Sequence, residues 1–274
     1  MKPNTVKGRL FAGLVYLFLY APIFILIIFS FNASKSRTVW AGFTFDWYIK
    51  LFSDDQILNP FYVTIVVAIL SSAVATIIGT VAAVGINSLR KKPKALMMTV
   101  NSLPVVNPDI ITGVSLMLLF VSMSAFIGIK LGFWTLLLAH ITFNIPYVIL
   151  SVMPKLRQLD KNLYEAALDL GATPMTAFVR VILPEIMPGV INGLLIAFTM
   201  SIDDFVISYF TSGSSVQTLA MSIYSMTRKR ITPEINALSA ILFVCVLTPL
   251  IIVNLRQARD MKKGKKIGAS SFGS

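Results

Sequence analysis

Three aspartates interrupt long apolar stretches of this chain, and their carboxylates are its strongest candidates for chemistry. Asp109 stands in NPDI (107–110), and the pair Asp203 and Asp204 stands in SIDDF (201–205). A carboxylate inside a bilayer is costly, so one that is kept there usually lines a path for an ion or a polar solute. Neighbouring helical residues point about 100° apart, so at most one of Asp203 and Asp204 can face such a path squarely.

Carboxylates along a channel favour a cationic cargo, and aromatic rings could add to the attraction. A cation–π contact contributes about 0.5–2 kcal/mol, and the candidates for it are Tyr147 in the fourth apolar stretch and Phe205 and Tyr209 in the fifth. The predicted substrate path comprises Asp109, Tyr147, Asp203, Asp204, Phe205 and Tyr209. The alternative is that the aspartates cap broken helices or pair with a neighbouring subunit.

The composition favours a membrane protein. The chain has 274 residues, of which 56% are hydrophobic and 13% are charged, and its mean hydropathy is +0.79. Its net charge of +12 comes from Lys and Arg in short loops beside apolar runs, so we expect a lipid partner and no nucleic acid.

The sequence contains few residues that could form a metal site, a disulfide or a catalytic site. Cys245 is the single cysteine, which excludes an intrachain disulfide. The single histidine, His140, has no partner His or Cys, which argues against zinc. We expect His140, Asn144 and Pro146 to contribute to helix packing and to a kink in the fourth apolar stretch. We therefore predict no catalytic residue, no metal and no cofactor in this chain.

Six apolar stretches predict membrane-spanning helices, since about 20 such residues cross a bilayer. They lie near residues 10–31, 60–86, 96–121, 133–153, 186–210 and 234–255. The first is too long for a signal peptide and lacks a convincing cleavage site, so we expect it to be retained. Pro104 and Pro108 should bend or open the third helix beside Asp109.

The distribution of Lys and Arg predicts that both termini face the cytoplasm, because most of the 24 basic residues, Lys2 among them, then lie on the inner side. The cluster Arg228–Arg230 goes against this bias, and contact with an external partner or a solvated helix end would each explain it. Residues 32–59 suit an external segment in which Trp40, Trp47 and Tyr48 lie at the membrane interface. We expect residues 256–274 to form a basic, flexible tail.

The loop at 154–185 carries a distinctive pattern, EAALDLGATPMTAFVRVILP over residues 165–184. Asp160 can cap a helix from about Lys161 to Leu170, and Gly171 can end that helix. Thr173 and Pro174 can then start a second one. The pattern predicts two short cytoplasmic helices joined at a glycine turn.

This loop resembles the ATPase-docking loop of permease subunits of ABC-type importers, whose pattern is E-A-A, three residues, G, nine residues, I-x-L-P. The matching residues are Glu165, Ala166, Ala167, Gly171, Leu183 and Pro184. Val181 replaces the usual Ile. The resemblance implies an all-α integral membrane protein with the six transmembrane helices of the type I ABC importer permease fold, cytoplasmic coupling helices, and one permease domain over 1–274. The two alanines would give a partner a small face to approach, and Glu165 would offer it a negative charge. The chain lacks a GxxxxGK[ST] phosphate loop, so a partner subunit would bind ATP and Mg²⁺.

Four further stretches resemble the second permease subunit type of spermidine/putrescine importers: FWTLLLAHITFNIPYV (133–148), NPDI (107–110), SIDDFVISYFTSG (201–213) and IYSMTRKRITPEINAL (223–238). This resemblance implies a bacterial inner membrane location and polyamine import by alternating access. It also implies a heterodimer with a second permease subunit, two copies of an ATPase subunit and an extracytoplasmic polyamine-binding protein. Asp109 matches a position along the path of that family.

Rival functions remain open at this point. The same kind of permease could carry ferric iron, a cationic amino acid or a thiamine-like solute. A proton-coupled secondary transporter would also explain buried aspartates, although it leaves the docking loop unexplained. A membrane scaffold or sensor that transports nothing is a third possibility.

Overall fold

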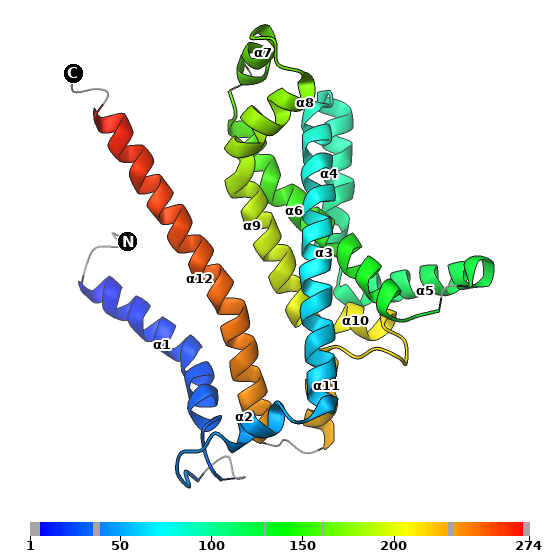
Figure 1. Cartoon of the computed structure of the whole chain (residues 1–274), viewed down its shortest axis with the longest axis vertical. Helices are drawn as coiled ribbons and strands as arrows, with labels where there is room; N and C mark the ends of the chain where they lie inside the picture. The colour runs from blue at the N-terminus through cyan, green and yellow to red at the C-terminus, as the bar shows by residue number, and fades with distance from the viewer. Residues whose placement is uncertain (1–5, 35–38, 129, 161, 230–232, 271–274) are drawn as a thin grey trace. The chain divides into compact units, whose positions relative to one another are not determined.

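The computed structural model describes residues 6–34, 39–128, 130–160, 162–229 and 233–270 (Figure 1). Lys2, Lys161, Arg230 and residues 271–274, which bear on the predictions above, lie outside this range. Within the described residues six helices are long and apolar enough to cross a membrane: Gly8–Phe29, Asp55–Ser88, Asp109–Phe126, Phe133–Gln158, Pro174–Asp203 and Glu234–Leu255. The all-α membrane fold with six spans is confirmed.

The helices follow one another along the chain with short connections. They are α1 (Val6–Phe29), α2 (Asp46–Leu51), α3 (Asp55–Ser88), α4 (Lys91–Val106), α5 (Asp109–Ile127), α6 (Phe133–Gln158), α7 (Asn162–Asp169), α8 (Pro174–Ala177), the π-helix η1 (Phe178–Ile182), α9 (Leu183–Asp203), α10 (Val206–Thr211), α11 (Leu219–Lys229) and α12 (Pro233–Ser270). The chain divides into two compact units. One comprises Met1–Asn59 with Ser222–Thr248, and the other comprises Pro60–Met221 with Pro249–Ser274.

The core of the larger unit is helix α6, which contacts both α3 and α9 closely at glycines. A Cβ atom on Gly79 of α3 would lie 2.8 Å from the Val148 side chain of α6, and one on Gly193 of α9 would lie 3.2 Å from Val148 Cα. Val148 is buried with Val152, Met153 and other apolar residues of α6 and α9. Because small residues let helix backbones approach closely, the three helices form a tight bundle inside this unit.

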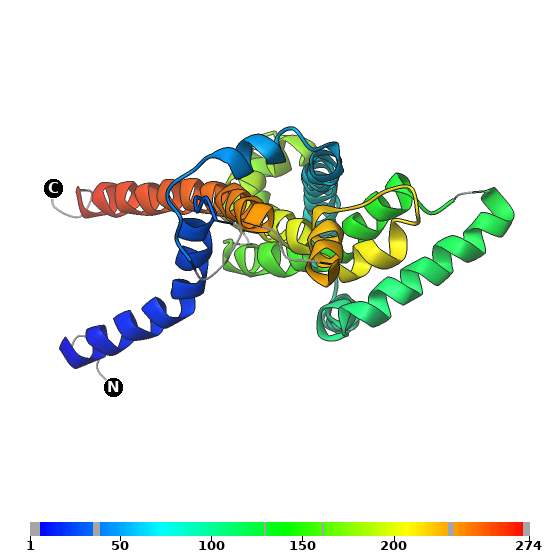
Figure 2. The same cartoon turned by 90° about the horizontal axis from the view of Figure 1, so that it is seen from below.

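The stretch expected to be one helix over 96–121 is two helices. Helix α4 ends at Val106, Asn107 and Pro108 are extended, and α5 starts at Asp109. Proline lacks an amide donor and disfavours helical geometry in the residue before it, which explains the break. The predicted opening at Pro108 is confirmed, but Asp109 lies in the first turn of α5 rather than in mid-helix. Helix α5 projects away from the bundle of α3, α6 and α9 in both views (Figures 1 and 2).

The fifth span differs from the expected 186–210 at both ends. Helices α8, η1 and α9 follow one another without a gap from Pro174 to Asp203, so the second helix of the docking loop runs directly into the membrane span. Helix α9 then ends at Asp203, and α10 begins at Val206. Figure 1 shows α7 and α8 at one end of α9, with α10 beyond its other end.

The last helix continues farther than the sequence suggests. Where we expected a flexible tail from residue 256, α12 remains helical to Ser270. The backbone therefore keeps its hydrogen bonds through the basic segment, although glycines and serines follow it.

Candidate functional site

Two of the predicted path carboxylates lie at helix ends in the larger unit. Asp109 occupies the first turn of α5, and Asp203 is the last residue of α9. Both are exposed, and they lie near enough for their like charges to act on one another. Tyr147, which is partly buried on α6, lies within electrostatic range of Asp109. Asp109 is thus within electrostatic range of Asp203 and of Tyr147, which come from two other helices.

A groove lies beside Asp109 at the break between α4 and α5. Its volume is about 280 Å³, and its lining includes Asn107 and Ile111, which flank Asp109 in sequence. Asn107, Thr112 and Ser115 add a few polar groups to a lining of Leu, Ile and Pro side chains. The groove is therefore mainly apolar, and it is lined by sequence neighbours of Asp109 but not by Asp109 itself.

Asp204 has a different environment from Asp203, because its carboxylate is turned toward α10. Its Oδ1 accepts a hydrogen bond from the Ile207 N–H at 3.2 Å. Its Oδ2 accepts from the Ser208 N–H at 2.7 Å and from the Ser208 hydroxyl at 2.8 Å. These are the orphan donors at the start of a helix, so Asp204 satisfies the first turn of α10 as a capping residue does.

His140 of α6 completes this cluster. Its Nε2 lies 3.0 Å from the Ser208 hydroxyl and 3.5 Å from Asp204 Oδ2. Since the hydroxyl proton of Ser208 is donated to Asp204, the Ser208 oxygen accepts from His140, and the imidazole carries a proton on Nε2. His140 is 1% exposed. The Asp204 carboxylate is thus hydrogen-bonded within the protein, to Ile207 and Ser208, whereas Asp203 is exposed.

A second buried chain of hydrogen bonds lies one turn along α6. Asn144 Nδ2 donates to the Ser201 hydroxyl of α9 at 2.8 Å, and that hydroxyl lies 2.9 Å from the Ser71 hydroxyl of α3. The sequence predicted packing for His140 and Asn144 but none of these serines. His140 and Asn144 are four residues apart and so lie on one helix face. That spacing is the signal that could have indicated a buried row of polar contacts along α6.

Two of the three aromatic candidates, Phe205 and Tyr209, lie together just before and on α10. The rings of Phe205 and Tyr209 are 5.7 Å apart, and Tyr209 is 57% exposed. Helix α10 packs on α5, where a Cβ atom on Gly113 would lie 3.0 Å from the ring of Phe210. This contact places α10, with its aromatic rings, against the helix that begins with Asp109.

The docking loop has the local structure that its sequence predicts. Asp160 accepts a hydrogen bond from the Asn162 N–H at 3.0 Å before α7. Gly171 has a φ of +84°, and the Thr173 side chain accepts from the Thr176 N–H at 3.3 Å with Pro174 in the first turn of α8. These contacts confirm the two short helices and the glycine turn.

The two alanines of the docking loop do not both face outward, although the sequence predicts that they do. Glu165 and Ala166 are exposed, but Ala167 is buried inside the chain. Ala167 therefore packs within the subunit, and a partner can approach only the Ala166 side. Leu183 is partly buried and Pro184 is exposed, at the start of α9.

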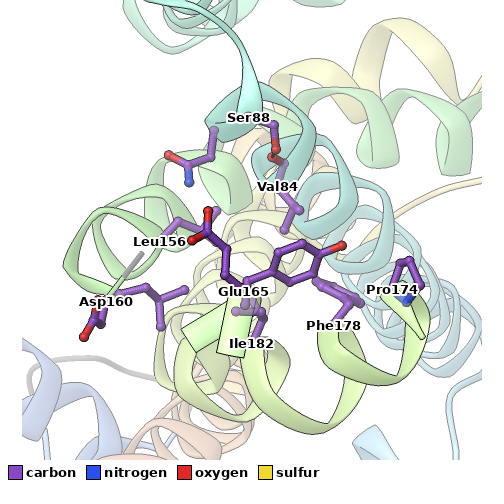
Figure 3. A pocket seen from close by; sticks show the side chains of 11 residues that line it. Val84, Ser88, Leu156, Asp160, Glu165, Pro174, Phe178 and Ile182 are labelled. Atoms are coloured by element: carbon purple, nitrogen blue, oxygen red, sulfur yellow. Dashed lines mark hydrogen bonds between the residues drawn. The ribbon is translucent and has the colours of Figure 1, made fainter. Parts of the chain in front are cut away.

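An open pocket of about 770 Å³ lies against the docking loop (Figure 3). It is lined by the ends of α3 and α6 and by the docking helices: Val84, Asn87, Ser88, Leu156, Leu159, Asp160, Tyr164, Glu165, Pro174, Phe178 and Ile182. In Figure 3 the Glu165 carboxylate points toward the end of α3, where Ser88 lies. Asp160 adds a second carboxylate to the lining. The pocket therefore combines two negative charges with apolar side chains such as Leu156, Phe178 and Ile182.

Comparison with known proteins supports these features. Residues 75–259 match the family of binding-protein-dependent transport system inner membrane components. The chain is 40% identical over 261 residues to the spermidine/putrescine transport system permease protein PotC of Escherichia coli K12, covering 94% of this chain and 97% of that protein. It is 43% identical over 237 residues to the putrescine transport system permease protein PotI of the same strain, covering 84% and 83%.

Solved structures share the fold at low sequence identity. A bacterial ABC transporter that imports the acidic polysaccharide alginate superposes with a TM-score of 0.70 at 18% identity, covering 93% of this chain and 95% of that one. An amino acid ABC transporter solved with histidines gives 0.55 at 20% identity, covering 79% and 99%. With the six spans, the docking loop and the match over 75–259, this chain belongs to the inner membrane components of binding-protein-dependent transport systems.

Proposed function

We propose that this chain is a permease subunit of an ATP-driven ABC importer that brings polyamines into the cytoplasm. Two relatives that match most of its length are named as permeases for spermidine and putrescine or for putrescine. The observation that supports the cargo class is that two exposed carboxylates, Asp109 and Asp203, lie at helix ends within electrostatic range of one another. A polyamine carries ammonium groups on a flexible apolar chain, which suits separated carboxylates with aromatic rings in the same unit.

The exposure of Asp109 and Asp203 favours a path rather than a lipid contact. A carboxylate facing hydrocarbon is expensive, and such groups usually face a water-filled cavity or a neighbouring helix. In a heterodimer with a second permease subunit, both carboxylates would face the space between the subunits. Tyr147, Phe205 and Tyr209 would flank the cargo there, and the groove beside Asp109 would hold part of its chain.

Asp204 has a supporting role in this proposal. Its oxygens already accept hydrogen bonds from Ile207 and Ser208, so a passing cation would have to displace them. Asp203 would contact the cargo, and Asp204 would fix the break between α9 and α10 that presents it.

Coupling to ATP would enter through the docking loop. The chain has no phosphate loop of its own, so two copies of an ATPase subunit would bind ATP and Mg²⁺. The pocket in Figure 3 would receive a cationic side chain of that partner, because Glu165 and Asp160 line it. An extracytoplasmic binding protein would deliver the polyamine on the opposite side, and both termini would face the cytoplasm.

The uninterrupted helical run from Pro174 to Asp203 would connect the ATPase-docking loop to the substrate path. Thirty residues of helix measure about 45 Å at 1.5 Å per residue. Closure of the ATPase pair would push on α7 and α8, and η1 and α9 would carry that movement as one rod toward Asp203. Outward opening would admit the polyamine, and ATP hydrolysis would restore the inward state. Moderate attraction by the carboxylates would permit release.

The test is uptake of labelled spermidine into proteoliposomes that contain the whole complex and its binding protein. ATP should drive uptake without a proton gradient. Unlabelled putrescine and spermidine should compete, while ferric iron, arginine and thiamine should not. Uptake that follows a proton gradient without ATP would exclude this function. If only ferric iron, arginine or thiamine competes, that solute rather than a polyamine is the transported substrate.

A further inference from the structure

Residues 30–34 and 39–54, between α1 and α3, form a small folded unit, the cap, in which the Ala33 N–H donates to the Gly42 carbonyl and the Thr44 N–H to the Phe31 carbonyl. Asn32 lies at its centre: its Nδ2 donates to the Val39 carbonyl at 2.8 Å, and its Oδ1 accepts from the Ala41 N–H at 2.9 Å. The indole N–H of Trp47 in α2 donates to the Asn32 carbonyl at 2.7 Å. These bonds fix α2 relative to the end of α1, so the orientation of its faces is defined.

Helix α2 buries one face against this cap. Trp47 and Leu51, four residues apart, are 5% and 3% exposed. The sequence suggests an interfacial position for Trp47, and the structure adds that its ring is buried within the cap, with its indole N–H bonded to the Asn32 carbonyl, so the ring itself does not face outward.

The opposite side of α2 carries an exposed apolar stripe. Phe45, Ile49 and Phe52 are 56%, 64% and 62% exposed, and their spacing of four and three residues places them on one helix face. Asp46 and Lys50 lie between the stripe and the buried face. Large side chains of this kind are not left in water as a contiguous patch without a partner.

Exposed apolar side chains also lie at the end of α1, close in sequence to the stripe. Phe24, Ile25 and Ile28, at the end of α1, are each more than half exposed, and that helix is apolar enough to span a bilayer. The ring of Phe31, just past α1, stacks on Phe43 at 5.2 Å and lies 5.5 Å from Phe45. Aromatic contacts thus connect the end of the span to the first residue of the stripe.

We propose that α2 lies along the membrane surface at which α1 ends and α3 begins, with Phe45, Ile49 and Phe52 immersed among the lipids. The partner is the lipid bilayer itself. Both flanking helices cross the membrane, so the segment must start and finish at the same bilayer surface. Amphipathic helices with aromatic residues on the apolar face insert at this depth, and the charged groups of Asp46 and Lys50 stay in water.

Spin labels at single cysteines test this directly. In a Cys245→Ala background, Ile49→Cys probes the stripe, and Asp46→Cys probes the polar side of the same helix. Phe18→Cys, at a position that is 81% exposed on α1, provides the lipid reference. The labelled full-length chains are reconstituted with their transporter partners, and retained uptake verifies their folding.

Collision rates with oxygen and with a water-soluble nickel complex then report the surroundings of each label. The ratio of oxygen to nickel collisions at position 49 should approach that at position 18 and exceed that at position 46 several-fold. Equal ratios at 49 and 46 would place the stripe in water and overturn the proposal. Low collision rates with both reagents at position 49 would show that a protein surface covers the stripe, which would overturn it equally.

Discussion

Ser208 donates two hydrogen bonds to one carboxylate oxygen of Asp204, from its backbone N–H at 2.7 Å and from its hydroxyl at 2.8 Å. This pair closes the first turn of α10 and draws in His140 from α6. Asp203, the preceding residue, is exposed. The chain therefore assigns two adjacent aspartates to different environments.

The first prediction separates these aspartates. Asp204→Ala removes the cap of α10 and leaves buried His140 with fewer partners, so the thermal stability of the purified complex should fall; loss of the cap alone costs about 0.5–2 kcal/mol. Asp203→Ala should leave the melting temperature unchanged and reduce polyamine uptake about tenfold or more, since losing a hydrogen bond to a charged group costs about 1.5–3 kcal/mol and about 1.4 kcal/mol corresponds to tenfold. A reversal of these two effects would contradict the roles given to the pair.

The second prediction concerns Glu165 in the docking pocket. Glu165→Gln keeps the size of the side chain but removes its charge, so binding of the ATPase subunit should weaken roughly 10–100-fold if a charge-assisted hydrogen bond of about 1.5–3 kcal/mol is lost. Asp169→Asn is the matched control, because Asp169 is exposed on the same helix and lies outside the pocket lining. Titration of detergent-solubilised permease with the ATPase measures both. Equal weakening by the two variants would indicate a general charge effect.

The third prediction tests the glycine turn. Gly171 has a φ of +84° and open space around it, so Gly171→Ala is disfavoured by backbone conformation alone, at a cost of about 1–2 kcal/mol. Gly85→Ala is the control, because Gly85 is helical and also has open space. It should leave stability unchanged or raise it by about 0.5–1 kcal/mol. Stimulated ATPase activity should fall only in Gly171→Ala, and an unaffected Gly171→Ala would refute the need for this turn.

The fourth prediction tests the contact between α9 and α6. A Cβ atom at position 193 would lie 3.2 Å from Val148, so Gly193→Ala should force the helices apart at a cost of about 1–3 kcal/mol. Gly13→Ala on α1 has nothing within 4 Å and should be neutral. Unfolding of the purified chain in a denaturing detergent compares the two. If Gly193→Ala is as stable as Gly13→Ala, the close approach does not matter for stability.

The docking loop could be predicted residue by residue because its determinants are local. Asp160, Gly171, Thr173 and Pro174 each act on backbone groups within a few positions, and the structure places them as expected. The break at Pro108 is local in the same sense, since proline acts on the residue before it.

The different environments of Asp203 and Asp204 could not be predicted in the same way. Helical geometry indicates that adjacent residues diverge, but not which of them turns inward. That choice depends on His140, which lies 68 positions before Ser208 in the chain. The burial of Ala167 and of Trp47 likewise depends on residues that only the folded chain brings together.

In the proposed mechanism Asp109 attracts a cationic cargo on the path, and a comparison of Asp109→Asn with the wild type tests this role most directly. ATP-driven spermidine uptake and ATPase activity are measured together in proteoliposomes that hold the full complex. Uptake should collapse in Asp109→Asn while assembly and ATPase activity persist. Undiminished uptake in Asp109→Asn, with a wild type that transports spermidine, would contradict it.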